Sequence, residues 1–243
     1  MRSSPAAFDR FAPTWDAEHG RHSPRAAEFR ARLALLERLC AGRRRVLELG
    51  CGTGQHLVAL APAIGEGVGV DFSPAMIDRA RANAEAAGIA NLRFLTGDAV
   101  TADTGTEPFD AVLLLGVIEH LPDRAAALAS CRDRLAGGGP AGGGRVVIVA
   151  PHPANPAFLW HRLRHGAPAR LFEGDRHLSP RGLARLARSC GLEPEGLHAL
   201  PGLPSHEGEG APPAAVRALM RAASRLPLPA ARGAFALVLK RRS

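Results

Sequence analysis

Short, mostly apolar runs recur along the chain and are separated by stretches in which apolar residues return every three or four positions. Runs of this length suit buried strands, and the longer spacing suits helices that bury one face. Strands that alternate with helices form a parallel sheet with helices on both of its faces. The pattern predicts a doubly wound α/β fold with a mostly parallel, seven-stranded sheet, whose strands are 46–49, 67–71, 91–95, 109–115, 145–150, 195–199 and 234–240.

Two segments late in the chain depart from this alternation. Residues 202–229 are punctuated by proline and glycine and leave room for one short helix, at about 212–225. Because no plain crossover helix joins the last two strands, we expect the last strand to pair antiparallel. Residues 151–178 contain four prolines, and we interpret them as an insertion after the fifth strand that lies over the carboxyl edge of the sheet. A glycine-rich loop at 137–144 is expected to be mobile.

The residues before the first strand form a segment of their own. Residues 1–23 are expected to be irregular, and their isolated apolar anchors are Phe8, Phe11 and Trp15. A serine–proline pair at 23–24 suits the start of a helix that runs to about Ala41. We expect 1–44 to be an N-terminal helical segment, either packed on the protein or part of a lid, and 45–243 to be the main domain.

Glycines and acids gather where the predicted strands end. The turn 50–54 has glycine at alternate positions and opens a helix, Asp71 ends the second strand, and 97–98 and 116–120 follow the third and fourth strands. The carboxyl ends of parallel strands meet at one edge of a sheet, and ligands bind there. Glycine lets a ligand approach the backbone, and a helix N-terminus offers free N–H groups. The pattern indicates a nucleotide-like ligand.

The acid at the end of the second strand narrows the choice of ligand. Asp71 lies 21 residues after Gly50, and an ionised carboxylate suits a ribose diol because it only accepts hydrogen bonds. A NAD-binding fold shares most of this pattern, but its third glycine comes one step later, where this chain has Gln55. A glycine turn alone is a weak signal, and the acids at successive strand ends strengthen it.

Four stretches of the chain resemble the class I S-adenosylmethionine-dependent methyltransferases, in the small-molecule branch that includes ubiquinone-type and natural-product enzymes. They are VLELGCGTG at 46–54, VDFSPAM at 70–76, GDA at 97–99 and FDAVLLLGVIEHLPD at 109–123. The resemblance is good from about residue 45 to residue 200. It implies a Rossmann-like methyltransferase sheet, S-adenosylmethionine as methyl donor and S-adenosylhomocysteine as product.

The resemblance also implies a reaction. A methyl group would pass by in-line displacement to an O or N atom of a small molecule, in secondary metabolism or cofactor biosynthesis. Two alternatives stay open: an RNA- or protein-directed methyltransferase with the same cofactor, and a non-catalytic cofactor-binding subunit.

Residue roles follow from the same resemblance. Glu48 would help to fix the turn and the amino group of the cofactor, and the carbonyl groups of Leu115 and Gly116 would face its ammonium. Glu48 also has a simpler interpretation as a strand-end acid. The implied cofactor-binding residues are Glu48, Gly50, Cys51, Gly52, Gly54, Asp71, Phe72, Met76, Gly97, Asp98, Ala99, Leu115, Gly116 and His120.

For the nucleoside half, the resemblance implies that Asp71 binds the ribose. Phe72 and Met76 would lie against the adenine, although Met76 is equally suited to an ordinary core position. Asp98 would accept from the adenine amino group, with the N–H of Ala99 beside it.

His120 is the candidate catalytic residue. The resemblance places it on the acceptor side of the cofactor, as a possible base or substrate orienter, although it would also suit a cap for a helix that begins at Pro122. In-line transfer needs alignment first, and a base only for a poorly acidic hydroxyl or a protonated amine. The expected acceptor-pocket residues are Trp15, His152, Trp160 and His177. No metal site is expected, because the histidines of the insertion lack a carboxylate at ligand spacing.

Composition limits the partners. The formal net charge is +8, and Lys240 is the only lysine, so the basic excess is arginine spread over many segments. We interpret this as a solvated basic surface, which makes nucleic acid an unlikely partner. No apolar run reaches the ~20 residues of a membrane span. The four scattered cysteines fit a reducing cytoplasm, and we expect a monomer or a homodimer.

Overall fold

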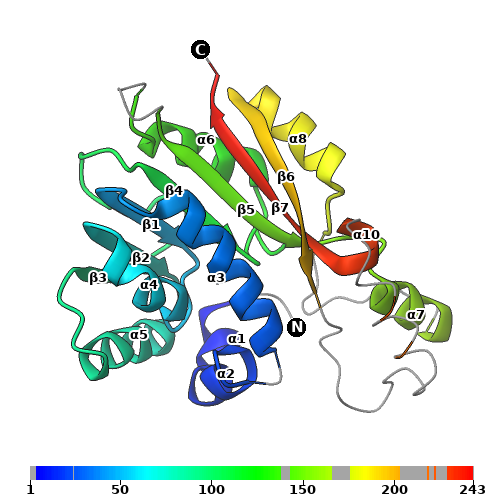
Figure 1. The fold of residues 1–243 in the computed structure, drawn as a ribbon, viewed down its shortest axis with the longest axis horizontal. Helices are drawn as coiled ribbons and strands as arrows, with labels where there is room; N and C mark the ends of the chain where they lie inside the picture. The colour runs from blue at the N-terminus through cyan, green and yellow to red at the C-terminus, as the bar shows by residue number, and fades with distance from the viewer. Residues whose placement is uncertain are drawn as a thin grey trace.

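The computed structural model describes residues 4–23, 25–137, 143–165, 176–202, 218, 222 and 229–242, and a seven-stranded sheet lies at its centre (Figure 1). The strand order is β3-β2-β1-β4-β5-β7-β6, with β1 to β5 parallel and β7 antiparallel to both of its neighbours. The predicted fold class, including the antiparallel last strand, is confirmed. The strands are β1 Arg45–Leu49, β2 Glu66–Asp71, β3 Leu92–Thr96, β4 Ala111–Leu115, β5 Arg145–Pro151, β6 Leu192–Pro201 and β7 Gly233–Arg241.

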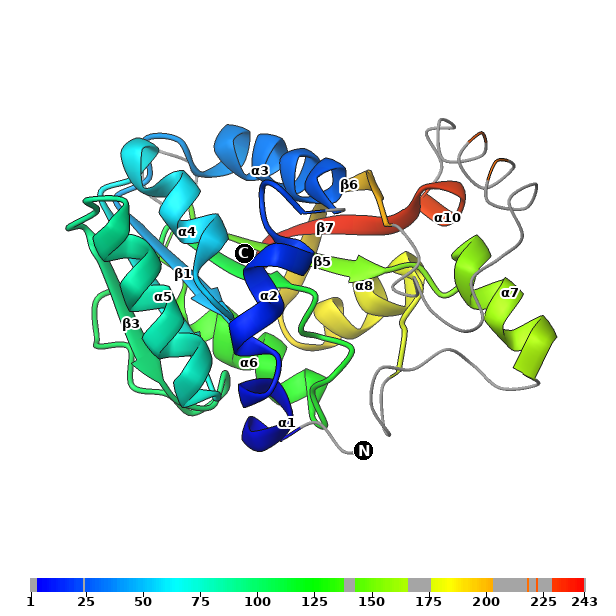
Figure 2. The same ribbon diagram turned by 90° about the horizontal axis from the view of Figure 1, so that it is seen from below.

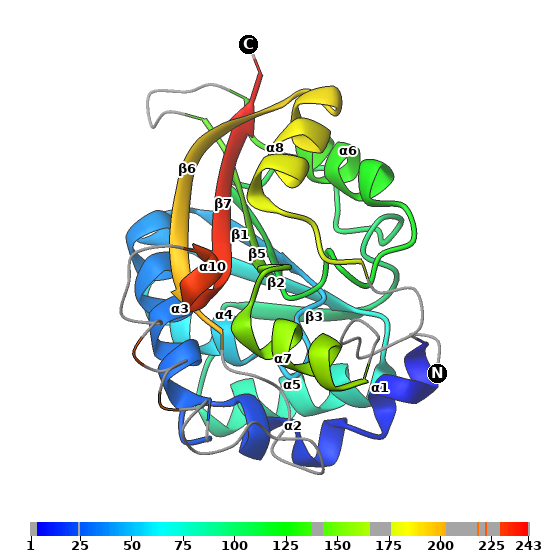
Figure 3. The same ribbon diagram turned by 90° about the vertical axis from the view of Figure 1, so that its right-hand side faces the viewer.

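Helices cover both faces of the sheet, as Figures 1 and 3 show. One face carries α3 (Ala26–Cys40), α4 (Gln55–Leu60) and α5 (Pro74–Ala86), and the other carries α6 (Arg124–Arg134) and α8 (Pro180–Ser189). Each layer has its own apolar core, because alternate residues of a strand point to opposite faces. Besides the N-terminal segment, the described chain contains the 3-10 turn η1 (Ala61–Ala63), α7 (Pro156–His165) and α10 (Pro229–Arg232).

The N-terminal segment is helical, so the expectation of an irregular segment over 1–23 is wrong. It contains α1 (Pro5–Asp9) and α2 (Ala12–His19), and α3 begins later than expected, at Ala26. Both α1 and α2 have proline in the first turn. Neither helix is long enough for its apolar residues to show a helical period in the sequence. Figure 2 shows α1 and α2 lying across the end of the sheet, beside the helices that follow β1 and β2.

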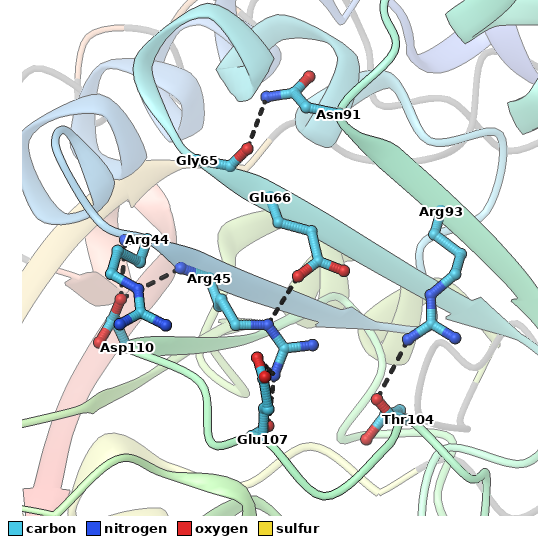
Figure 4. A network of polar contacts seen from close by, with 9 residues as sticks. All are labelled: Arg44, Arg45, Gly65, Glu66, Asn91, Arg93, Thr104, Glu107 and Asp110. Carbon is cyan, nitrogen blue, oxygen red and sulfur yellow. Dashed lines mark hydrogen bonds and ion pairs between the residues drawn. The ribbon is translucent and has the colours of Figure 1, made fainter.

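Charged side chains hold the opposite, amino-terminal edge of the sheet (Figure 4). The Nε of Arg45 donates to Glu66 at 2.7 Å, and the Arg45 guanidinium lies 4.5 Å from the centre of the Phe109 ring. Asp110 accepts from the backbone N–H groups of Arg44 and Arg45 at 2.8 and 3.1 Å. These contacts join the starts of β1 and β2 to the residues just before β4, so the carboxyl ends of these strands finish side by side.

Some expectations concern the later chain. Strand β6 is longer than the predicted 195–199. Apart from residues 218 and 222, the short helix expected at 212–225 lies outside the described residues, as does most of the glycine-rich loop. All four cysteines are buried free thiols. Within the described ranges, no helix has the length and apolar character that crossing a bilayer requires.

Candidate functional site

A cavity of about 720 Å³ opens at the carboxyl edge of the sheet, against α1 and α2. Its walls come from the turns after β1, β2, β3 and β4 and from the N-terminal segment. Most residues predicted to bind a cofactor line it: Gly50, Gly52, Asp71, Phe72, Met76, Gly97, Asp98, Ala99, Leu115, Gly116 and His120. The structure therefore brings together residues that are far apart in the sequence.

The turn after β1 presents bare backbone to this cavity. Gly50, Gly52 and Gly54 all have φ between +53° and +74°, a region that other residues rarely adopt. A Cβ on Gly50 would lie 2.4 Å from a methyl carbon of Val117. On Gly52 it would lie 3.6 Å from the indole nitrogen of Trp15. A side chain at Gly50 would therefore clash, and the positive φ disfavours one at Gly52, so a ligand can approach the peptide groups of these two glycines closely.

Asp71 ends β2 with a buried carboxylate at the cavity wall. Its Oδ1 accepts from the N–H of Ser73 at 3.0 Å, and its Oδ2 accepts from the N–H of Gly52 at 2.9 Å. Burial raises the pKa of Asp71, although these backbone hydrogen bonds oppose the shift. A carboxylate oxygen has a second lone pair, so each oxygen can accept one more bond, which fits a vicinal diol.

Asp98 shapes the turn after β3. Its Oδ1 accepts from the N–H groups of Val100 and Thr101 at 2.8 and 3.2 Å. The residue is exposed and lines the cavity beside Ala99. Met76 is 1% exposed and still forms part of the cavity wall, so its core role and its predicted contact with a ligand are compatible.

A smaller, polar cavity of about 90 Å³ adjoins the glycine turn and shares Trp15, Gly50, Gly52 and Leu115 with the larger one. Charged and titratable side chains from α2, α3, β1 and α4 meet there. They include two of the remaining predicted residues, Glu48 and Cys51, together with Glu28, Arg32 and His56.

The polar atoms of this cavity are incompletely paired. Arg32 contacts Glu28 at 3.5 Å, and Nδ1 of His56 lies 3.6 Å from Glu48. In the described part of the chain, Nε of Arg32, Oε2 of Glu48 and Nε2 of His56 are buried without a hydrogen-bond partner. Such groups are costly to bury unless a ligand or water pairs with them. A donor and an acceptor side by side fit the carboxylate and ammonium of an amino acid.

Burial sets the charge of this group. It raises the pKa of Glu48 to about 8, with the Asp71 charge adding to the shift and Arg32 opposing it. Burial and the Arg32 charge lower the pKa of His56 to about 3. Both side chains are therefore neutral near pH 7 in the protein alone.

Sequence reasoning missed Arg32, Glu28 and His56. A signal was present: Glu28 and Arg32 are four residues apart on α3 and interrupt the face that also buries Phe29 and Leu36. A charged pair on the buried face of a helix indicates a polar site beneath it.

His120 lies in the loop after β4 and lines the larger cavity. Its backbone N–H donates to Val117 at 2.9 Å, and its ring lies 6.2 Å from that of Phe8. The interpretation of His120 as a helix cap is not supported, because α6 begins at Arg124 and Asp123 caps it by accepting from the N–H of Ala126 at 2.8 Å.

The predicted acceptor residues are not all together. Trp15 lines both cavities, whereas the other three are absent from the described walls of either. His152 lies against Phe235, with ring centres 6.1 Å apart, and His177 stacks on Phe158 at 4.6 Å. Trp160 belongs to α7, at the far end of the sheet from α5 (Figure 1). Residues 166–175 lie outside the described chain.

Comparisons with known proteins agree with this geometry. A family model described as a methyltransferase domain matches residues 46–139. Trans-aconitate 2-methyltransferase of Streptomyces coelicolor is 35% identical over 211 residues, covering 79% of this chain and 67% of that protein. Ubiquinone biosynthesis O-methyltransferase of Cereibacter sphaeroides is 28% identical over 211 residues, covering 78% and 81%.

A solved structure extends the comparison to the fold. The structure of DhpI in complex with S-adenosylhomocysteine superimposes with a TM-score of 0.62 at 22% identity. The match covers 98% of this chain and 95% of that one.

Proposed function

Because this chain belongs to the class I S-adenosylmethionine-dependent methyltransferases, we propose that it transfers the methyl group of S-adenosylmethionine to a hydroxyl oxygen of a small molecule in cofactor or secondary metabolism. The observation that carries the proposal is the cavity of about 720 Å³ in which the glycine turn, Asp71 and His120 meet. Both relatives' names describe methyl transfer, and that of the ubiquinone enzyme supports an oxygen acceptor, whereas the other relative is named for trans-aconitate.

The residues at the carboxyl edge fit the cofactor. Asp71 has lone pairs for the ribose hydroxyls, and the absence of side chains at Gly50 and Gly52 leaves room for the methionine chain. Arg32 and Glu48 would pair with the carboxylate and ammonium of the methionine part through the atoms that now lack partners. Phe72 and Met76 would flank the adenine, and Asp98 and Ala99 would meet its polar edge. When bound, S-adenosylmethionine supplies an already activated methyl group.

The protein's own task is alignment and proton removal. The walls hold the acceptor oxygen in line with the methyl group, which accounts for much of the rate enhancement in reactions of this type. Phe8 and Trp15 line the cavity on the side of α1 and α2 and exclude water from the reacting atoms. His120 accepts the proton of the acceptor hydroxyl, and a base is needed there because a neutral hydroxyl is a weak nucleophile.

The lining favours an uncharged hydroxyl over an acid. Among the described lining residues of the larger cavity, the titratable ones are Asp71, Asp98 and His120, and no arginine or lysine joins them. A carboxylate acceptor would therefore find no arginine or lysine among these lining residues to pair with. It would also need no base, because it is already ionised at neutral pH.

The test is a methyl-transfer assay with S-adenosylmethionine labelled in the methyl group. We expect label in neutral phenols or alcohols and little label in di- or tricarboxylates offered at the same concentration. Exclusive labelling of polycarboxylates, amines or RNA would contradict the proposed acceptor, and failure to bind S-adenosylmethionine would contradict the proposed cofactor.

A further inference from the structure

Two aromatic–aspartate pairs lie seven residues apart in the N-terminal segment: Phe8-Asp9 on α1 and Trp15-Asp16 on α2. The Phe8 ring lies 5.2 Å from Phe72, and both Phe8 and Trp15 line the larger cavity. In each pair, the ring covers the cavity and the next residue holds the helix to the protein. The two helices therefore form a roof over the proposed cofactor site.

Asp16 joins α2 to three parts of the domain. Its Oδ1 accepts from the Thr53 hydroxyl and the Gln55 amide, both at 2.5 Å. Its Oδ2 accepts from Arg79 at 3.1 Å and from Asn83 at 3.0 Å. These donors come from the glycine turn, the start of α4 and α5. Although burial raises the pKa of Asp16, the four hydrogen bonds outweigh it and lower the pKa, so the carboxylate is ionised.

Asp9 makes the corresponding connection for α1. Its Oδ1 accepts from the Ser73 hydroxyl at 2.5 Å and from the N–H of Ala75 at 3.4 Å. The N–H of Ser73 donates to Asp71.

Both anchoring points therefore adjoin the donors that hold Asp71. One of these donors is Ser73 itself, and the other is Gly52, which directly precedes Thr53 in the chain. A movement of either anchor displaces a residue that orients the ribose-binding carboxylate.

We propose that Asp9 and Asp16 are positioning residues that latch α1 and α2 over the bound cofactor and set the rate at which it dissociates. This inference rests on the proposed function. The rings of Phe8 and Trp15 must lift before a ligand beneath them leaves. Lifting α2 breaks the four hydrogen bonds of Asp16, and lifting α1 breaks the two of Asp9. The latch belongs to the cofactor half of the cavity. It therefore governs how fast S-adenosylmethionine replaces S-adenosylhomocysteine between turnovers.

The test uses Asp16→Asn and Asp9→Asn. An asparagine amide keeps the shape but turns an N–H₂ group toward donors, which weakens the latch. The matched control is Asp78→Asn, because Asp78 is an exposed acid on α5 that pairs with Arg81 at 3.2 Å. All variants carry Trp160→Phe. The chain has two tryptophans, so Trp15 is then the only indole and reports on the roof.

The measurement is the dissociation rate of S-adenosylhomocysteine by stopped-flow fluorescence, with thermal unfolding recorded in parallel. We expect dissociation at least tenfold faster in each of the two latch variants and within twofold of the parent in Asp78→Asn. If Asp16→Asn does not fold, Asp9→Asn decides by the same criterion.

Two different results would contradict the latch and the proposed function. Dissociation within twofold of the parent would show that these carboxylates do not control cofactor release. A lower melting temperature in the same variants would then limit their role to stabilising the fold. If the Trp160→Phe parent itself binds neither S-adenosylmethionine nor S-adenosylhomocysteine, the proposed function fails and the latch fails with it.

Discussion

Several polar side chains at the carboxyl edge of the sheet are buried with atoms that lack hydrogen-bond partners. This arrangement is more favourable with a ligand bound than without one. Glu48 is 1% exposed, and its pKa is raised to about 8 by burial and by the Asp71 charge. Leaving Oε2 of Glu48 and Nε of Arg32 unpaired costs stability. Proteins retain such costly groups where they bind or react, and here they surround the proposed amino-acid end of the cofactor.

Glu48 predicts a pH dependence of stability. Its pKa is higher in the folded chain than in the unfolded one, so the folded state binds the extra proton and Glu48 makes stability fall as pH rises from about 4.5 to about 8. We expect Glu48→Gln to melt about 2–4 °C above wild type at pH 9, or roughly 1 kcal/mol, and to lose that advantage at pH 5. Equal shifts at both pH values in thermal unfolding would contradict a raised pKa.

Replacement of His120 is expected to lower kcat without weakening the binding of S-adenosylmethionine. Replacing it with asparagine removes the proposed base, so we expect kcat to fall by roughly 10²-fold or more. The dissociation constant for S-adenosylmethionine should stay within threefold of wild type, because the hydrogen bonds proposed for the cofactor come from other residues, although His120 lines the same cavity. Steady-state kinetics with an accepted hydroxyl substrate and a binding titration separate the two effects. A kcat within threefold of wild type would exclude base catalysis by His120.

Among the elements, α6 illustrates how one residue can position a functional loop. Asp123 accepts from the N–H of Ala126, and this cap ends the loop that carries His120. Arg124 donates to the carbonyl groups of Ile118 and Glu119 in the same loop, both at 2.9 Å. The start of this helix therefore fixes the loop after β4.

The cap predicts a modest and local loss of stability. We expect Asp123→Ala to lower the free energy of unfolding by about 1 kcal/mol, the usual contribution of an N-cap aspartate. Asp133→Ala is the control, because Asp133 lies in the last turn of the same helix, where a negative charge opposes the helix dipole. Denaturant unfolding of both variants checks this, and equal losses would show that the cap contributes nothing particular.

The elements also show what the sequence could predict. Strand β4 is apolar throughout and buried, so its place at the centre of a parallel sheet could be predicted from the sequence. The acids at the ends of the strands then indicated where the site lies. Helices α1 and α2 were missed because they are short and have no apolar period. Hydrogen bonds that Asp9 and Asp16 accept from residues more than 35 positions away hold these helices in place. Such tertiary anchors leave no local pattern.

The polar cavity was missed for a related reason. Arg32 lies outside the segments that carry the family resemblance, and only the packing of α3 on the sheet brings it next to Glu48. The acceptor residues His152, Trp160 and His177 were predicted from their aromatic or titratable side chains and their place in the segment 151–178. The fold nevertheless directs two of them toward Phe235 and Phe158. The type of a residue alone does not show which way its side chain points in the fold.

At the scale of the whole molecule, the sheet separates two apolar layers. Leu36 of α3 and Leu183 of α8 are both fully buried, and they belong to different cores on opposite faces. We expect each alanine substitution to cost about 2–5 kcal/mol and the double variant to equal their sum within about 0.5 kcal/mol, because the sites share no partner. Denaturant titrations of the three variants measure this. A large deviation would show that the layers are coupled through the sheet.

The N-terminal segment lies at the carboxyl edge of the sheet, where Asp71 lines the proposed cofactor cavity together with Phe8 and Trp15. The direct test is calorimetric titration of S-adenosylmethionine into wild type, Asp71→Ala and the exposed control Asp78→Ala. We predict micromolar-range binding by wild type and Asp78→Ala. Asp71→Ala should bind about 100-fold more weakly, or roughly 2.7 kcal/mol for two hydrogen bonds to a charged group. Binding by a folded Asp71→Ala protein within threefold of wild type would contradict the cofactor site described here.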